Sequence, residues 1–303
     1  MFKKNYKIIK DNPYTADELE GLGIIIESKW NDSFIDIISK NNIKHLFLNH
    51  SFGWMCDDYS FLISLCGIKT IDIIDVHSNM IRSIESQSNL ESLSLNLPEA
   101  YEVDFSKFRF LKSLFCYGRK PNSTLYECAS LEELYIDEYK CCDSRNLGKL
   151  RRLKNLTIAN SNMTSLSFLT QLSNLTSLSL LNCRSLSTFE EISSLTNLKK
   201  LEIRGSKIHD ISFLHGSKML EILIIESDYL DSISTLQGLI SIKALALIGS
   251  TMIINDGDLS AIKSLRNLSM LQIPNKRTYK YKIHNYWNWK EYGMHSQIWL
   301  TPK

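Results

Sequence analysis

The chain has 303 residues, of which 44% are hydrophobic and 22% charged, with only 12 glycines and 5 prolines. This composition is typical of a folded globular protein and excludes a disordered or collagen-like chain. The net charge of +2 gives no reason to expect a nucleic-acid partner, because such partners favour a strongly basic chain.

The sequence shows no segment for membrane insertion or secretion. No apolar run approaches the roughly 18 residues that a membrane-spanning helix needs. Near the start, Lys10 directly follows Ile8 and Ile9, so the apolar core of a signal peptide is missing. The seven cysteines are irregularly spaced, which is typical of reduced thiols. We therefore expect a cytoplasmic protein with no membrane partner.

Residues 1–42 are expected to form an N-terminal cap with a first irregular repeat. Apolar residues between 31 and 41 predict a short helix that begins after Asn31 or Asp32. Such a cap would cover the end of the core formed by the repeats that follow.

One motif, apolar-x-x-apolar-x-apolar, recurs along most of the chain. Its clearest copy is Leu153-Lys-Asn-Leu156-Thr-Ile158. Alternate residues of this motif would point into a core and their neighbours away from it, as in a β-strand. The twelve copies begin at positions 19, 43, 68, 90, 111, 131, 153, 175, 198, 220, 242 and 268.

Between these copies, apolar residues recur at every third position. After Ile158 they are Met163, Leu166, Leu169 and Leu172. This period favours short 3-10 helices or irregular turns with one apolar side. A single strand cannot bury its face alone, so the copies are expected to stack into a parallel sheet over one continuous core.

This repeat resembles that of leucine-rich-repeat proteins, above all the 22-residue type of internalins and protein-phosphatase regulatory subunits. Ser206-Lys-Ile208-His-Asp-Ile211-Ser-Phe-Leu214 is similar to the internalin pattern N-x-I-x-D-I-x-x-L. The resemblance implies a bacterial α/β protein, a curved solenoid of about 12 repeats over residues 43–273. Its concave face would be a parallel sheet and its convex face 3-10 or irregular turns. The position usually held by Asn carries residues that could bond nearby backbone, namely Ser161, Cys183, Ser206, Asp228 and Ser250.

Residues 274–303 differ from the repeats in composition and are expected to form a C-terminal cap. They combine aromatic residues with Lys and Arg, and include Tyr279, Tyr281, Tyr286, Trp287, Trp289, Tyr292 and Trp299. These rings would either seal the last repeat or form a contact surface for a partner.

Motifs for catalysis, cofactors or metals are missing from the sequence. It contains no glycine-rich phosphate loop, no G-x-S-x-G elbow and no H-E-x-x-H pair. Cys141 and Cys142, with Cys128, are interpreted as half-buried thiols near a turn rather than a metal site. His209-Asp210 is interpreted as a polar pair on the surface. We expect no enzymatic activity, no cofactor and no small-molecule substrate.

The outward positions of the strands are the predicted binding surface. The central column runs Phe47, Asp72, Ser94, Phe115, Tyr135, Thr157, Ser179, Glu202, Ile224, Ala246 and Gln272. Phe115, Tyr117 and Tyr135 form an aromatic cluster next to the acidic residues Glu132, Glu133 and Asp137. This cluster has the composition of an interface hot spot, unless residues 99–109 cover its rings. The predicted partner-binding residues are Phe115, Tyr117, Glu132, Glu133, Tyr135, Asp137, Lys200, Glu202, Arg204, Ile224 and Glu226.

Two further features bear on the partner. The outward residues Ile222, Ile224, Ala244, Ala246 and Ile248 form an apolar strip, which we expect either the aromatic tail or a partner to cover. Residues 83–106 and 219–242 hold acidic residues without Lys or Arg, which would favour a basic partner.

These observations predict a non-enzymatic protein-binding chain that is a monomer when free. In its most specific form, it is a cytoplasmic immunity or inhibitor protein that occludes a basic toxin domain with its concave face. The alternative is a bacterial effector or adhesion-type protein that binds a host protein.

Overall fold

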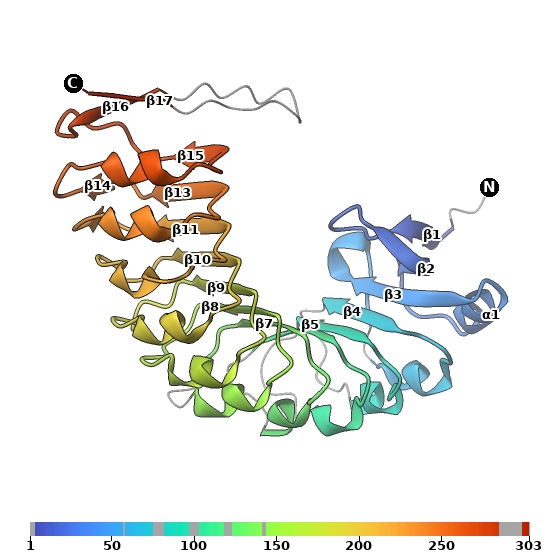
Figure 1. Cartoon of the computed structure of the whole chain (residues 1–303). Coiled ribbons are helices and arrows are strands. Elements are labelled where there is room, and N and C mark those ends of the chain that lie inside the picture. Colours follow the sequence, from blue (N-terminus) through green and yellow to red (C-terminus); the bar gives the residue numbers. More distant parts are fainter. Residues whose placement is uncertain are drawn as a thin grey trace. The chain divides into compact units, whose positions relative to one another are not determined.

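The computed structural model describes residues 4–56, 58–74, 82–96, 103–117, 123–140, 144–284 and 299–302. The chain forms two compact units, Met1–Asp137 and Glu138–Lys303. Within each unit, strands lie side by side on one face and short 3-10 helices on the other (Figure 1). This is the arrangement of a leucine-rich-repeat solenoid, so the predicted fold class is confirmed.

The strands of the first unit follow one another in chain order. The β1–β2 pair is antiparallel and each later pair is parallel. The elements are β1 (Tyr6–Asp11), β2 (Glu18–Ile26), α1 (Ser33–Lys40), β3 (Ile43–Asn49), η1 (His50–Phe52), η2 (Ser60–Ser64), β4 (Thr70–Ile74), η3 (Arg82–Ser86), β5 (Ser92–Asn96), η4 (Phe105–Lys107), β6 (Ser113–Tyr117), η5 (Ser123–Glu127) and β7 (Glu133–Asp137).

The second unit continues the same alternation and adds two small sheets. Its main strands are parallel, β12 pairs with β14 on the turn side, and β16 and β17 are antiparallel. The elements are η6 (Arg145–Lys149), β8 (Asn155–Ala159), η7 (Ser167–Gln171), β9 (Ser177–Leu181), η8 (Glu190–Ser194), β10 (Lys200–Arg204), η9 (Ser212–Leu214), β11 (Ile222–Glu226), β12 (Tyr229–Leu230), η10 (Ser234–Gly238), β13 (Ala244–Ile248), β14 (Ile253–Ile254), η11 (Ser260–Ser264), β15 (Met270–Gln272), β16 (Tyr281–His284) and β17 (Trp299–Pro302).

The core lies between the sheet and the turns of each unit, as the two periods predicted. Leu178 and Leu180 of β9 are fully buried, and so are Met163, Leu166 and Leu172 from the period-three segments. The apolar residues of the turns therefore complete the core that the strands begin.

The first repeat is set two residues later than predicted. Ile24 and Ile26 are fully buried, and Ile24 pairs with Leu46, the middle position of the next motif. The core motif of this repeat is therefore Leu22-x-Ile24-x-Ile26 rather than Leu19-x-x-Leu22-x-Ile24. The pairing of β1 with β2 is irregular between Glu18 and Gly23, and the register of β2 with β3 shifts between Leu22 and Gly23, so the motif is displaced. The helix is confirmed, because α1 begins at Ser33.

The position usually held by Asn behaves as predicted in one repeat and not in another. The Ser161 hydroxyl donates to the Tyr139 carbonyl and accepts from the Met163 amide. In the repeat of β11, Ser227 rather than Asp228 makes the corresponding hydrogen bond, since its buried hydroxyl donates to the Ile208 carbonyl. Asp228 is exposed.

The described part of the C-terminal segment packs on the turn side of the last repeat. The buried Tyr279 hydroxyl accepts a hydrogen bond from the Ile254 amide at 3.2 Å, and the Lys263 ammonium lies 4.2 Å from the centre of the Tyr281 ring. Tyr286, Trp287, Trp289 and Tyr292 lie outside the described residues. The segment boundaries at residues 42 and 274 stay predictions.

Candidate protein-interaction face

The strand register of the first unit places the predicted central column on one face of the sheet. Phe47 pairs with Asp72, Asp72 with Ser94, Ser94 with Phe115, and Phe115 with Tyr135. We call the side of the sheet that points away from the 3-10 turns the outward face. Neighbouring residues of the column are about 4.8 Å apart because this is the spacing of paired strands.

Two aromatic rings stack on this outward face. The centres of the Phe115 and Tyr135 rings are 4.2 Å apart and their planes differ by 14°. Both side chains are only half-buried, although Leu114 and Leu134 beside them are buried in the core. We name Phe115 and Tyr135 the aromatic pair.

The described part of the loop that precedes β6 does not cover the aromatic pair. Phe105 and Phe108 are buried, and the Phe105 amide donates to the hydroxyl of Thr124 in η5. Residues 103–109 therefore belong to the turn side, and the predicted alternative, that residues 99–109 cover the rings, fails for this stretch. Residues 99–102 lie outside the described residues.

Acidic residues flank the aromatic pair in the same strands. Glu133 lies opposite Ser113, and Asp137 lies opposite Tyr117 at the other end of β6 and β7. Glu132 directly precedes this stretch. The backbone of Tyr117 belongs to β6, but its side chain is outside the described residues. The structure thus gathers the predicted first-unit residues on two adjacent strands.

The beginning of the outward face is covered, which the sequence interpretation missed. Phe47 and Asp72 belong to the column, yet both are buried. The turn that joins β1 to β2 lies over them, and the Tyr14 hydroxyl donates to the Asp72 carboxylate. The side-chain amide of Asn49 donates to the same hydroxyl at 3.1 Å. The Asn12-Pro13 pair was the available signal for this turn.

Burial also changes the acidity of the covered groups. It raises the pKa of Asp72, while hydrogen bonds from Ser94 and Tyr14 act in the opposite direction. The pKa of Tyr14 is raised as well, first by burial of its hydroxyl and then by the charge of Asp72. The hydroxyl therefore stays protonated and donates to the carboxylate.

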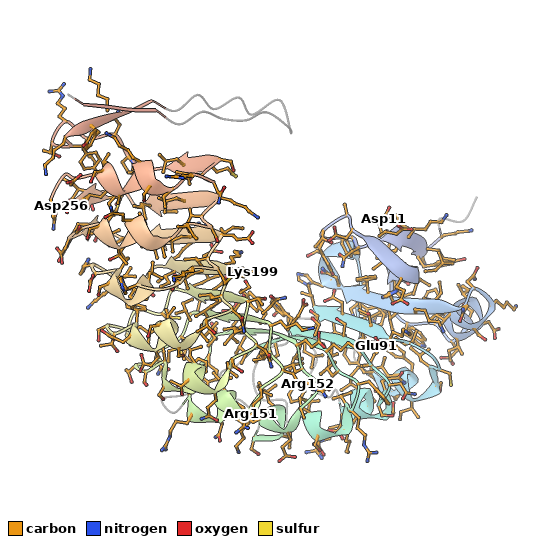
Figure 2. The ribbon with its side chains drawn as sticks, in the orientation of Figure 1. Asp11, Glu91, Arg151, Arg152, Lys199 and Asp256 are labelled. Atoms are coloured by element: carbon orange, nitrogen blue, oxygen red, sulfur yellow. The ribbon has the colours of Figure 1, made fainter. Side chains whose placement is uncertain are left out.

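The first acidic stretch is not an acidic surface in the described residues, because lysines one repeat away pair with it. Glu91, labelled in Figure 2, lies 2.8 Å from the Lys69 ammonium and 2.9 Å from that of Lys112. Hydrogen bonds from these lysines lower the pKa of Glu91 to about 2. Glu85 pairs with Lys107 in the same way. The expectation from residues 83–106 was wrong for these groups because a linear window cannot show partners about 22 residues away.

The strand register of the second unit also matches the predicted central column, although Ser179 of that column is buried. Thr157 pairs with Ser179, Ser179 with Glu202, Glu202 with Ile224, and Ile224 with Ala246. The remaining pair is Ala246 with Gln272.

Opposite charges along β10 and its neighbours compensate one another. Glu202 lies between Arg204, at 2.6 Å, and Lys200, at 3.3 Å. Glu221 of the second acidic stretch pairs with Lys243 at 2.6 Å. Glu226 ends β11 and lies opposite Ile248. The predicted second-unit residues therefore form a mixed charged border beside an apolar area.

That apolar area consists of the outward residues of β11 and β13. Ile222, Ile224, Ala244, Ala246 and Ile248 are all half-buried and in register. We name these residues the apolar strip. The described tail residues Tyr279 and Tyr281 contact Ile254 and Lys263 rather than this strip.

The described residues contain no cluster of His, Cys, Asp and Glu that could hold a metal ion. Burial raises the pKa of the Cys116 thiol to about 12 and that of Cys128 to about 11, so neither forms a nucleophilic thiolate near neutral pH. Cys141 and Cys142 lie outside the described residues. His209, between β10 and η9, stacks on Tyr229 of β12, with ring centres 4.0 Å apart. No helix in the described part of the chain has the length and apolar character needed to cross a membrane.

Comparison with known proteins supports the fold class. The chain has the fold of leucine-rich-repeat proteins. It is similar to an internalin of Listeria monocytogenes, with 20% identity and a TM-score of 0.57, over 78% of this chain and 68% of that one. A leucine-rich-repeat protein of Leptospira interrogans matches with 18% identity and a TM-score of 0.59, over 77% of this chain and 61% of that one.

A more distant source gives the same architecture. The mouse RP105/MD-1 complex contains a chain with 18% identity and a TM-score of 0.56, over 76% of this chain and 43% of that one. The chain thus spans less than two thirds of the Leptospira and mouse proteins. No protein-family model and no curated protein matches the sequence. At these identities the likeness establishes the fold alone.

Proposed function

We propose that this chain is a non-enzymatic protein-binding module and that the outward face of its sheet is the binding surface. The observation that carries the proposal is the aromatic pair, which is stacked and half-exposed on two adjacent strands whose opposite faces are buried. Rigid aromatic residues surrounded by polar groups are the residues that most often dominate binding energy at protein interfaces. The similar mouse structure is itself a complex, of RP105 with MD-1.

The proposed contacts form one area in each unit. The first area is centred on the aromatic pair, and the second on Ile224 at the charged border of the apolar strip. Their residues are Phe115, Tyr117, Glu132, Glu133, Tyr135 and Asp137 in the first unit, and Lys200, Glu202, Arg204, Ile224 and Glu226 in the second.

In its most specific form, the proposal is a bacterial cytoplasmic immunity protein that neutralises a toxin domain by covering it, and that is a monomer when free. Support comes from a surface suited to contact rather than reaction, with acidic residues beside the aromatic pair. Fewer acidic residues support a basic toxin partner than the sequence suggested, because Glu85, Glu91 and Glu221 already pair with lysines.

The second candidate is an effector or adhesion-type protein that binds a host protein. Its support is the likeness in fold to an internalin of Listeria monocytogenes. The two candidates differ in where the partner is found, because a neutralising protein meets its toxin in the cytoplasm of its own cell.

Capture of partners from the native cytoplasm, followed by affinity measurement, tests the proposal. A co-purifying toxin domain supports the immunity role, whereas a lysate without any specific partner argues against it. Replacement of Tyr135 and Glu133 by Ala should weaken the identified complex by about 3 kcal/mol, because it removes the centre of the contact.

Phe110→Ala is the matched control. Phe110 is an aromatic residue of the same unit, 57% exposed, in the turn before β6 and not on the outward face. Its replacement should leave the affinity unchanged. Equal losses for both variants, or none for the double variant, would move the binding surface elsewhere.

A further inference from the structure

The cover over the beginning of the outward face is built around one tyrosine side chain. Both hydrogen-bonding functions of the Tyr14 hydroxyl are used, since it donates to Asp72 and accepts from Asn49. Its ring stacks on Phe52 at 5.9 Å and meets Phe47 edge-on at 6.1 Å. These groups complement a phenol in shape and in polarity.

The polar groups beneath Tyr14 are unusual for a buried place. Asp72 and Asn49 are only 5% and 4% exposed, whereas Ser94 and Asn96, which continue their columns in β5, are half-buried. His45 of the same strand face is also buried, and its Nδ1 has no hydrogen-bond partner among the described residues. Such residues suit a recognition surface better than a core.

The cover itself is a small, self-supporting turn. Its hydrogen bonds run from the Asn12 amide to the Asp17 carbonyl and from the Ala16 amide to the Asn12 carbonyl. None of residues 12–17 is buried, and the whole Tyr14 residue is 48% exposed. The turn could therefore lift as a unit without breaking bonds of the sheet, at the cost of the Tyr14 contacts.

We infer that the outward face of β3 and β4 is a phenol-binding site, that Tyr14 occupies it as a displaceable internal ligand, and that a tyrosine on a partner's contact loop takes its place. The site would extend the binding surface from the aromatic pair towards the N-terminus. The inference rests on the proposed function only for the identity of the incoming tyrosine.

Small phenols test the site without any partner protein. In Tyr14→Ala, 4-methylphenol should bind and raise the melting temperature, and it should bind roughly tenfold or more tightly than toluene, which lacks the hydroxyl. Wild-type protein should bind neither, because its site is filled. Adding Asp72→Asn to Tyr14→Ala should reduce the preference for the phenol. A folded Tyr14→Ala variant that does not distinguish 4-methylphenol from toluene would overturn the inference.

Hydrogen exchange tests whether the cover is displaceable. In wild-type protein, amides of residues 12–17 should exchange much faster than those of β5 and β6. Tyr14→Phe, which keeps the ring and serves if Tyr14→Ala does not fold, should accelerate exchange in the turn while β5 and β6 stay unchanged. Turn amides that exchange only together with the sheet, or that do not respond to Tyr14→Phe, would show a permanent cap instead. Neither assay involves the aromatic pair, so its outcome is independent of the proposed partner binding.

Discussion

At the edge where the strands begin, ion pairs join neighbouring repeats in both units, and the second unit also uses hydrogen bonds from side-chain amides. In the first unit, Glu91 links two repeats through Lys69 and Lys112. In the second, Glu221 pairs with Lys243 in the same way, and the side-chain amides of Asn174 and Asn197 each donate to a backbone carbonyl of the preceding repeat, both at 2.9 Å. Exposed ion pairs weaken in salt, whereas neutral amide bonds barely respond.

The outward faces differ as well. The first unit begins under the Tyr14 turn and then presents the aromatic pair, while the described second unit presents the apolar strip beside the charges of β10. The cores, in contrast, are built alike from buried leucines and isoleucines. A shared core motif therefore leaves both the edge chemistry and the face chemistry open to variation.

Truncation of a core leucine should lower the unfolding free energy more than any other change proposed for the two units. Leu178 in the second unit and Leu114 in the first are both buried at the middle position of the motif. We expect Leu178→Ala and Leu114→Ala each to cost about 3–4 kcal/mol of unfolding free energy, because each removes core contacts and leaves a cavity. Urea denaturation, with hydrogen exchange as the probe of each unit, measures the loss of unfolding free energy. A much smaller cost for Leu114→Ala would mean that the first unit has the looser core.

A single glycine tests how tightly the second unit's turns are packed. Gly249 has φ of 145°, and an added Cβ would lie 2.1 Å from the Ser227 carbonyl oxygen. Gly249→Ala should therefore cost about 2–3 kcal/mol. Gly238→Ala is the control, because no atom lies within 4 Å of the new Cβ. If thermal unfolding shifts equally for both variants, steric strain at Gly249 is not the cause.

The regular repeat made the fold predictable from the sequence, whereas the parts of the candidate site that depart from the repeat were not predicted. The alternation of Leu156 and Ile158 fixes which face is buried, so the outward column followed from the sequence alone. The Tyr14 cover did not follow, because it depends on a contact between residues 58 positions apart that are not related by the repeat. The lysine partners of Glu91 lay within reach of sequence reasoning, since residues one repeat apart become neighbours once the register is known.

Asp72, in the covered start of the first unit, should make the unfolding free energy depend on pH. Since burial raises the folded-state pKa of Asp72, its neutral form is favoured on folding. Its stabilising contribution is therefore present below the ordinary aspartate pKa and is lost as the pH rises through the raised value. Relative to Asp72→Asn, wild-type protein should lose unfolding free energy between pH 3 and pH 7. A difference that grows with pH would contradict this assignment.

The smallest effects should separate the two kinds of bond between repeats. Asn197→Ala removes a neutral bond and should cost about 1 kcal/mol at any salt concentration. Glu91→Gln should cost less and only at low salt, because its pairs with Lys69 and Lys112 are exposed and screened.

The sign of the pH dependence sharpens this last comparison. The pKa of Glu91 is lowered to about 2, so its contribution is present above the ordinary glutamate pKa and is lost as the pH falls towards 2. The difference between wild-type protein and Glu91→Gln should therefore grow with pH, opposite to that for Asp72→Asn. Chemical denaturation by urea at low and high NaCl, across pH 2.5 to 7, measures both. If Asn197→Ala shows the same salt dependence as Glu91→Gln, the amide bonds and the ion pairs do not join the repeats by different forces.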